Sequence, residues 1–286
     1  MLWFELTVQG LVQGSIYALV AVGLTLVYGL LRILHVAHAG LFTLGGYICV
    51  LVTNATGSFA LSLAVAVPIV GLIGVAIYRF CYQPILSKPP YVALIASIGL
   101  FIAMEEIYRI VFGPYGLSYT NPPLSESIQF AGIRLREVEI VTIIGAVILI
   151  GALALLARKT RMGVAWRATV TDPEMAQSFG IDIIKVRYMN FFIGAALAAV
   201  AGGLVAVLNN LVEPTMGSVP SYKALAIIVL GGLGDVRGTL VAAIALGIIE
   251  SFGTIYLGTL LDRDAIAFAF LIAVLMLRPQ GLFGRA

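Results

Sequence analysis

The chain has 286 residues, of which 61% are hydrophobic and 11% are charged, and its formal net charge is +3. Soluble domains average roughly 45–50% apolar and about 25% charged residues, so this composition excludes an ordinary soluble domain. The basic residues are spread through segments that flank apolar runs, and they give no indication of nucleic-acid binding.

Long apolar runs predict membrane-spanning helices, because lipid cannot satisfy backbone polar groups and the short alternation of a barrel is absent. A span needs about 20 residues, which leaves room for eight or nine segments. We therefore expect an all-α, polytopic membrane protein with a single domain over residues 1–286. The first apolar segment lacks a basic flank and is too long for a cleavable signal peptide. Cys49 and Cys81 form no disulfide framework or metal motif.

The first two predicted segments differ in regularity. Residues Val8–Leu30 predict a helix with small residues at four-residue spacing (Gly10, Gly14 and Ala18), which allows another helix to approach closely. The next segment, Leu31–Val52, has polar residues at its start and several glycines in its body. It therefore predicts a broken or re-entrant helix, a form that needs protein or a cavity around its backbone.

The middle of the chain predicts helices at Phe59–Phe80, Tyr91–Phe112 and Ile140–Ala157, with a proline-containing loop at 113–139. The second of these helices carries two acids near its end. Glu105 and Glu106 stand four and three residues before Arg109, so we favour ion pairing along the helix. A functional role for such acids, which are costly in lipid, is the alternative.

Residues 158–187 form a basic insert that holds six of the seventeen Lys and Arg residues. Thr171 and Glu174 have the spacing of a capping box, Pro173 suits a first helical turn, and Gly180 suits a left-handed stop. We therefore expect a short helix over Pro173–Phe179. The insert is either a connecting loop that orients the protein or a docking element for a cytoplasmic subunit.

The last part of the chain predicts a helix at Tyr188–Leu208 with two adjacent seams of small residues. Residues Lys223–Leu230 are too short to span before the glycine-rich stretch 231–238, so this is a second candidate broken helix. Helices at Thr239–Leu257 and Ala265–Leu277 complete the chain. Glu250 has no charged neighbour on its helix, and both an interhelical hydrogen bond and a pathway role remain open.

Sidedness follows from the basic residues, which favour the cytoplasmic side. If the 158–187 insert is cytoplasmic and the segments alternate, the C-terminus is cytoplasmic and the 113–139 loop is extracytoplasmic. Twelve of the seventeen basic residues then lie inside, namely the six of the insert with Arg32, Arg79, Lys88, Arg237, Arg278 and Arg285.

Four segments, in order along the chain, resemble the permease subunits of branched-chain amino acid ABC importers of the LivH/LivM type, and the LivH-like subunit most of all. They are Gly23–Tyr47, Arg161–Asp182, Ile228–Ser251 and Leu277–Gly284. The resemblance implies a bacterial inner-membrane protein, a second and distinct homologous permease, two cytoplasmic ATPase subunits and a periplasmic substrate-binding protein. It also implies that this chain is not an enzyme, with ATP and Mg held by the ATPases. No P-loop motif occurs in this sequence.

The resemblance also implies roles for individual residues. Those expected to couple to the ATPase are Arg161, Gly163, Arg167, Ala168, Asp172, Pro173, Glu174, Ala176, Gly180 and Ile181. Those expected along the substrate pathway are His35, His38, Gly40, Gly45, Gly46, Gly231, Gly232 and Glu250. No catalytic residue is expected.

One motif departs from the family. Members usually read near Asn-Phe-Ala-His-Gly-Glu where this chain has His35-Val36-Ala37-His38-Ala39-Gly40. If this helix lines the pathway, the departure favours a cargo other than leucine, isoleucine and valine. His35 and His38 lack a nearby carboxylate or thiol, so they form an incomplete metal-ligand set. We expect them to hydrogen-bond to neighbouring helices or to face water.

Three functions are compatible with parts of this sequence. An importer permease for hydrophobic amino acids, or for a related small polar solute such as urea, an amide or an aromatic acid, accounts for the basic insert. An ion- or proton-coupled secondary transporter would also use broken helices, but it gives no reason for a capped helix in that insert. An intramembrane enzyme built on the two histidines lacks a nucleophile–base constellation. The exact cargo and the identity of the second permease stay open.

Overall fold

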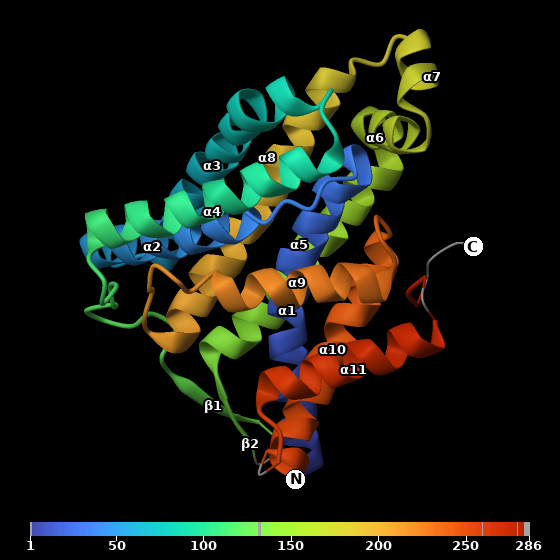
Figure 1. The fold of residues 1–286 in the computed structure, drawn as a ribbon. Helices are drawn as coiled ribbons and strands as arrows, with labels where there is room; N and C mark the ends of the chain where they lie inside the picture. Colours follow the sequence, from blue (N-terminus) through green and yellow to red (C-terminus); the bar gives the residue numbers. More distant parts are fainter. Residues whose placement is uncertain (1, 131–132, 259, 279, 283–286) are drawn as a thin grey trace.

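Helix α1 (Leu2–Leu31) lies at the centre of the fold, and other helices enclose it (Figure 1). The computed structural model describes residues 2–130, 133–258, 260–278 and 280–282. Helix α10 (Val236–Leu257) runs along α1, and α8 (Ile183–Asn209), α9 (Ser218–Gly231) and α5 (Glu137–Lys159) also pack against it. Of the most apolar stretch of α1, 78% is buried. This helix is therefore an interior element and not a lipid-facing one.

Close backbone contacts hold α1 in place. A Cβ atom on Gly10 would lie 2.7 Å from the Cα of Ile248 on α10, and one on Gly23 would lie 2.9 Å from the carbonyl oxygen of Gly194 on α8. The predicted small-residue spacing of α1 is thus confirmed, as is the seam on α8. Helices in lipid gain their association from such van der Waals contact, which larger side chains would prevent.

The second predicted segment is not a broken helix. The chain leaves the helical path at Arg32–Ala37, and α2 (His38–Thr56) is then continuous through its three glycines. Gly40 and Gly45 face Met104 and Ala199 at distances that admit no Cβ atom. These glycines therefore serve close packing, and the interruption of the helix precedes them.

The second predicted break is confirmed with shifted bounds. Helix α9 has 14 residues and begins at Ser218, before the expected Lys223. It ends at Gly231, and Gly232 and Gly234 adopt φ angles of 105° and 88°, a region that favours glycine. Asp235 then caps α10 by accepting a hydrogen bond from the Gly238 backbone N–H at 2.8 Å.

The remaining elements complete a bundle of tilted helices. Helix α3 (Phe59–Ile77) leads into a π-helical turn at Tyr78–Tyr82 and a 3-10 turn at Gln83–Ile85, and α4 (Pro90–Phe112) follows. The 113–139 segment, predicted as a loop, contains a hairpin of strands β1 (Ser127–Phe130) and β2 (Ile133–Arg136), and its last three residues already belong to α5. Helix α11 (Arg263–Leu277) is the last element.

Seven helices in the described residues are long and apolar enough to cross a membrane, and the shorter α9 and α11 add 14 and 15 residues. The chain is an all-α, multi-pass membrane protein, as predicted. Arg285, counted above among the cytoplasmic residues, lies outside the described residues.

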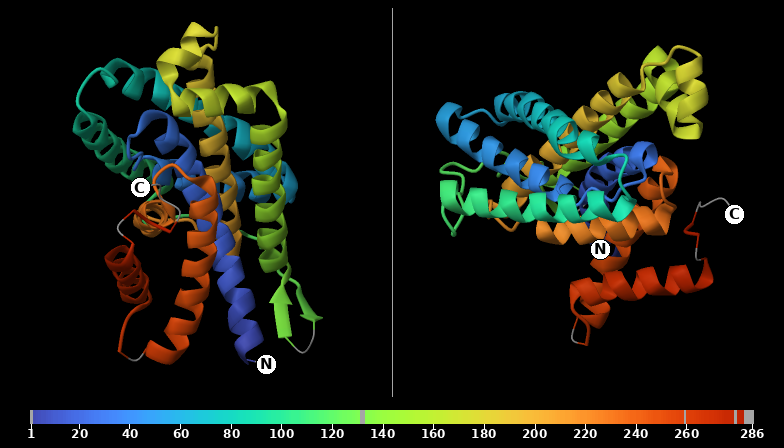
Figure 2. Two further views of the ribbon diagram at one scale, coloured as in Figure 1. Left: turned by 90° about the vertical axis from the view of Figure 1, so that its right-hand side faces the viewer. Right: turned by 45° about the horizontal axis from the view of Figure 1, so that its top comes forward.

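The two ends of the bundle carry different elements. Helices α6 (Arg161–Thr171) and α7 (Pro173–Ser178) project at one end, and the N-terminus and the β-hairpin lie at the other (Figures 1 and 2). After α11 the chain returns to the end of α9, where the Leu282 backbone N–H donates to the Leu230 carbonyl at 2.7 Å.

Candidate functional site

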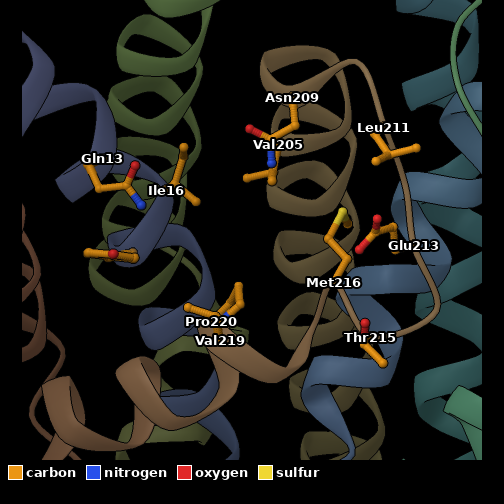
Figure 3. Close-up of a pocket in the computed structure, with 11 residues that line it drawn as sticks. Gln13, Ile16, Val205, Asn209, Leu211, Glu213, Thr215, Met216, Val219 and Pro220 are labelled. Atoms are coloured by element: carbon orange, nitrogen blue, oxygen red, sulfur yellow. The ribbon is translucent and has the colours of Figure 1, made fainter. Parts of the chain in front are cut away.

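A cavity of about 420 Å³ opens between α1, the end of α8, the 210–217 loop and the start of α9 (Figure 3). It is lined by Gln13, Ile16, Tyr17, Val205, Asn209, Leu211, Glu213, Thr215, Met216, Val219 and Pro220. Figure 3 shows Gln13 and Ile16 on α1 across from Asn209 and Glu213. The cavity lies toward the hairpin end of the bundle, away from α6 and α7.

The lining combines an apolar wall with a few polar groups, which is typical of small-molecule sites. Ile16, Val205 and Met216 supply apolar surface, and Gln13 supplies an amide. Glu213 is the only acid in the lining, and no ion pair among the described residues involves it. The cavity therefore offers a negative group beside an apolar surface.

A second cavity, of about 380 Å³, adjoins the first and shares Gln13, Ile16, Val205 and Asn209 with it. Its further lining includes both signs of charge. Arg136 pairs with Glu139 at 3.2 Å, and Arg263 pairs with Glu250 at 3.0 Å. We call the two cavities together the hairpin-side cleft.

A buried charge network borders this cleft. Lys223 on α9 is 3% exposed, and its Nζ lies 2.9 Å from both Glu250 Oε1 on α10 and Asp264 Oδ1 on α11. Tyr17 on α1 donates to Glu250 Oε2 at 2.7 Å, and Lys223 donates to the Tyr17 hydroxyl at 3.0 Å. The network joins four helices, and it meets the cleft because Tyr17 also lines the larger cavity.

The two histidines lie inside the bundle. His35 and His38 are 1% and 2% exposed, and neither lines the hairpin-side cleft. His35 Nδ1 lies 2.6 Å from the Tyr82 hydroxyl, which confirms the expected hydrogen bond for this residue. For His38 the expectation is wrong, because both of its ring nitrogens are buried and have no hydrogen-bond partner among the described residues. The described residues contain no group of three or more His, Cys, Asp and Glu side chains that could hold a metal ion.

Four of the five glycines expected along the pathway pack closely against other elements, and the fifth, Gly232, ends α9. Gly46 faces Met216, and a Cβ on Gly231 would lie 2.7 Å from the Gly238 carbonyl oxygen. Glu250 belongs to the charge network described above. The pathway role of this whole set stays a prediction.

The basic insert contains two short helices instead of the one expected. Thr160 caps α6 by accepting from the Gly163 backbone N–H at 3.0 Å, and Asp172 caps α7 by accepting from Met175 at 3.0 Å. The predicted Thr171–Glu174 capping box is wrong by one residue, because Pro173 at the first helical position places the cap on Asp172. Gly180 does adopt the left-handed conformation, with φ of 82°.

The residues expected to couple to an ATPase lie on this pair of helices, at the cap between them and directly after α7, and they divide by exposure. Gly163 and Ala176 are buried, and Ala168 and Ile181 are half-buried. The other six are exposed, namely Arg161, Arg167, Asp172, Pro173, Glu174 and Gly180. Three large apolar side chains accompany them, since Val164 is 53%, Met175 is 55% and Phe179 is 80% exposed.

The junction with α8 is polar. Asp182 caps α8 by accepting from the Ile184 and Lys185 backbone N–H groups, and its carboxylate pairs with the Lys185 side chain at 3.2 Å. These contacts with Lys185 lower the pKa of Asp182 below its ordinary value and so favour the charged form of this cap.

Comparison with known proteins identifies the family. A family model described as "Branched-chain amino acid transport system / permease component" matches residues 6–277. The chain belongs to this permease family.

Individual relatives cover this permease almost completely. LivH, a high-affinity branched-chain amino acid transport system permease protein of Escherichia coli (strain K12), is 34% identical over 97% of the chain and 94% of LivH. BraD of Pseudomonas aeruginosa, described in the same words, is 29% identical over 99% of the chain and 96% of BraD. LivM of Escherichia coli (strain K12) is 27% identical over 93% of the chain and 67% of LivM.

A solved structure shares the fold of the permease. A chain of PsaBC from Streptococcus pneumoniae, determined in complex with a Fab, superposes with a TM-score of 0.51 over 96% of this chain and 92% of the other. The two sequences are 11% identical, so the likeness concerns the fold alone.

Some polar contacts inside the permease were not predicted from the sequence. Arg109 does pair with Glu106 at 2.8 Å, as expected, but Glu105 instead accepts from Ser218 on α9 at 2.8 Å. Lys223 is not among the twelve residues expected inside, and the sequence pattern places it within an apolar run, where the structure buries it. A charged side chain within an apolar run needs a partner inside the protein, so the position of Lys223 in the sequence could have indicated a buried ion pair.

Removing Lys223 should destabilise the permease. In Lys223→Met the buried Glu250 carboxylate keeps only Arg263 as an ionic partner, so we expect a loss of roughly 3 kcal/mol, the lower end for a broken buried pair. Thermal unfolding in detergent measures it. Lys185→Met is the control, because its exposed pair with Asp182 contributes little. Equal stability of the two variants would contradict a structural role for the network.

Proposed function

We propose that this permease is the transmembrane subunit of an ATP-binding-cassette importer that carries branched-chain or other hydrophobic amino acids. The observation that carries the proposal is the match to LivH along almost the whole of both chains. In this arrangement a periplasmic binding protein delivers the cargo, and ATP and Mg are bound by separate ATPase subunits. The chain itself moves solute and catalyses no reaction.

The α6–α7 pair is the proposed docking element for an ATPase. It stands out from the bundle at one end (Figures 1 and 2). Val164 and Met175 on these helices, and Phe179 directly after α7, are exposed apolar residues that lie among charged ones, a composition that supports contact with a soluble protein. The caps at Thr160 and Asp172 support a defined shape for this element, which a coupling role requires.

The hairpin-side cleft is the proposed entry for cargo. An amino acid with an apolar side chain carries an ammonium group and a carboxylate at one end. Glu213 can accept the ammonium group, the apolar wall can receive the side chain, and the nearby arginines can attract the carboxylate. The expected pathway set of His35, His38, Glu250 and the glycines would then act deeper in the bundle, by supporting the helices around the route.

The proposed orientation places α6 and α7 in the cytoplasm of a bacterial inner membrane and the cleft outside. The basic residues support it through the positive-inside rule. The relatives include both LivH and LivM, which favours a distinct second permease over an identical copy. The Leu282 backbone N–H donates to the Leu230 carbonyl, so the chain after α11 lies beside the end of α9. A cytoplasmic end of α9 would therefore place the C-terminus in the cytoplasm as well.

Reconstitution tests the proposed function. The permease, its partner permease, the ATPases and the binding protein are incorporated into vesicles, and uptake of labelled leucine is measured. We expect uptake that requires ATP and the binding protein. Uptake by this chain alone, driven by a proton or sodium gradient, would establish a secondary transporter and overturn the proposal.

Truncating Phe179 tests the docking element. Phe179→Ala removes the most exposed aromatic side chain of α6–α7, and we expect ATPase association to weaken about 30-fold or more, the scale of a binding hot spot. Co-purification of the ATPase and ATP-dependent uptake measure it. Phe80→Ala is the control, because Phe80 is 76% exposed outside the insert. Unchanged association in Phe179→Ala would show that the ATPase binds elsewhere.

A further inference from the structure

A groove of about 250 Å³ lies between α5, α6 and the start of α10, at the α6–α7 end of the bundle. Its wall is apolar, and three arginines from three different helices border it. The lining residues are Ile150, Leu153, Ala154, Ala157, Arg158, Trp166, Arg167, Val236, Arg237 and Leu240. None of these residues belongs to the hairpin-side cleft.

The arginines of this groove have no acidic partner within the part of the chain that the structure describes. Arg158, Arg167 and Arg237 are exposed, and none of them enters an ion pair among the described residues. Three like charges around one groove repel each other unless an anion lies among them. The positive charge around the groove therefore favours the binding of a negatively charged group there.

Among the described residues, the one aromatic side chain that lines the groove is that of Trp166, which carries an unpartnered hydrogen-bond donor. Trp166 Nε1 is buried and has no hydrogen-bond partner among the described residues. An indole N–H usually finds a partner when it is buried, and tryptophan is enriched where one end of the ring is apolar and the other is wet. Its position fits a ligand with a polar head and an apolar tail.

The surroundings of the groove favour a lipid as that ligand. Helix α5 continues from it with an apolar surface that includes Ile144, Val147 and Leu155, all more than half exposed. A free phosphate would gain nothing from the apolar wall, whereas an acyl chain can lie along it. Basic pockets between transmembrane helices on the cytoplasmic side are suited to anionic lipid headgroups.

We propose that this groove binds an anionic phospholipid, with its phosphate held by Arg158, Arg167 and Arg237 and an acyl chain along α5 and α10. The bound lipid ties α6 to α5 and α10, because each of these helices contributes an arginine. The base of the docking element is thereby fixed, and transport becomes sensitive to the anionic lipid content of the membrane. This lipid site rests on the proposed cytoplasmic position of α6 and α7, and it does not depend on the nature of the cargo.

Tryptophan fluorescence tests the site directly. The chain has two tryptophans, so Trp3→Phe leaves Trp166 as the only one. The full-length variant is reconstituted in phosphatidylcholine vesicles that contain phosphatidylglycerol or phosphatidylcholine with brominated acyl chains, which quench nearby indoles. We expect brominated phosphatidylglycerol to reach half-maximal quenching at a mole fraction at least about fivefold lower, the scale of one lipid–arginine interaction.

Matched variants separate this site from general attraction to a basic surface. Arg158→Gln with Arg237→Gln should abolish the preference for phosphatidylglycerol. Lys88→Gln with Lys159→Gln removes the same charge outside the groove and should retain it. Inorganic phosphate at constant ionic strength should not relieve the quenching.

Three outcomes would overturn the proposal. Equal quenching by the two brominated lipids would show that the headgroup is not recognised. A preference that survives Arg158→Gln with Arg237→Gln would place the anionic lipid elsewhere. Relief of quenching by inorganic phosphate would show that the arginines hold a free anion.

Discussion

The structure depends on how closely the backbone of α1 approaches its neighbours. Gly10 and Gly14 admit α10, and Gly23 admits α8, so a helix at the centre of the bundle contacts two others without large side chains between them. In lipid there is little hydrophobic gain from burying one apolar helix against another, and such contacts must supply the association. Contacts with other helices therefore hold α1 in position, and α1 in turn places Gln13 and Tyr17 in the lining of the cleft.

The charge network adds a second constraint on the same helix. Tyr17, Lys223, Glu250 and Asp264 connect α1 to the three helices that follow the 210–217 loop. Because Tyr17 also lines the larger cavity, a change in the cleft can reach α9 and α10 through two hydrogen bonds. The cleft and the α6–α7 pair lie at opposite ends, and α8 runs from the insert to the cleft, so one rigid element connects the proposed entry to the proposed docking element.

The elements that the sequence predicted well depend on local pattern. The spans follow from apolar runs, the α1 seam from the spacing of Gly10 and Gly14, and the end of α7 from Gly180, because each is decided within a few residues. The features that it missed depend on distant partners. The glycines of α2 were expected to break the helix, and only the position of Met104 and Ala199 shows that they pack instead. Tyr17 and Lys223 are 206 residues apart, so no helical spacing could reveal their contact.

Cysteine labelling in the assembled importer tests most directly whether the hairpin-side cleft is the route of the cargo. Cys49 and Cys81 are replaced by alanine, and Gln13→Cys is exposed to a membrane-impermeant maleimide from the extracytoplasmic side. Val147→Cys, on the exposed apolar face of α5, is the control. A route through the cleft predicts rapid labelling of Gln13→Cys, protection by the leucine-loaded binding protein, and no labelling of Val147→Cys. Failure to label Gln13→Cys, or labelling that leucine and the binding protein leave unchanged, would contradict it.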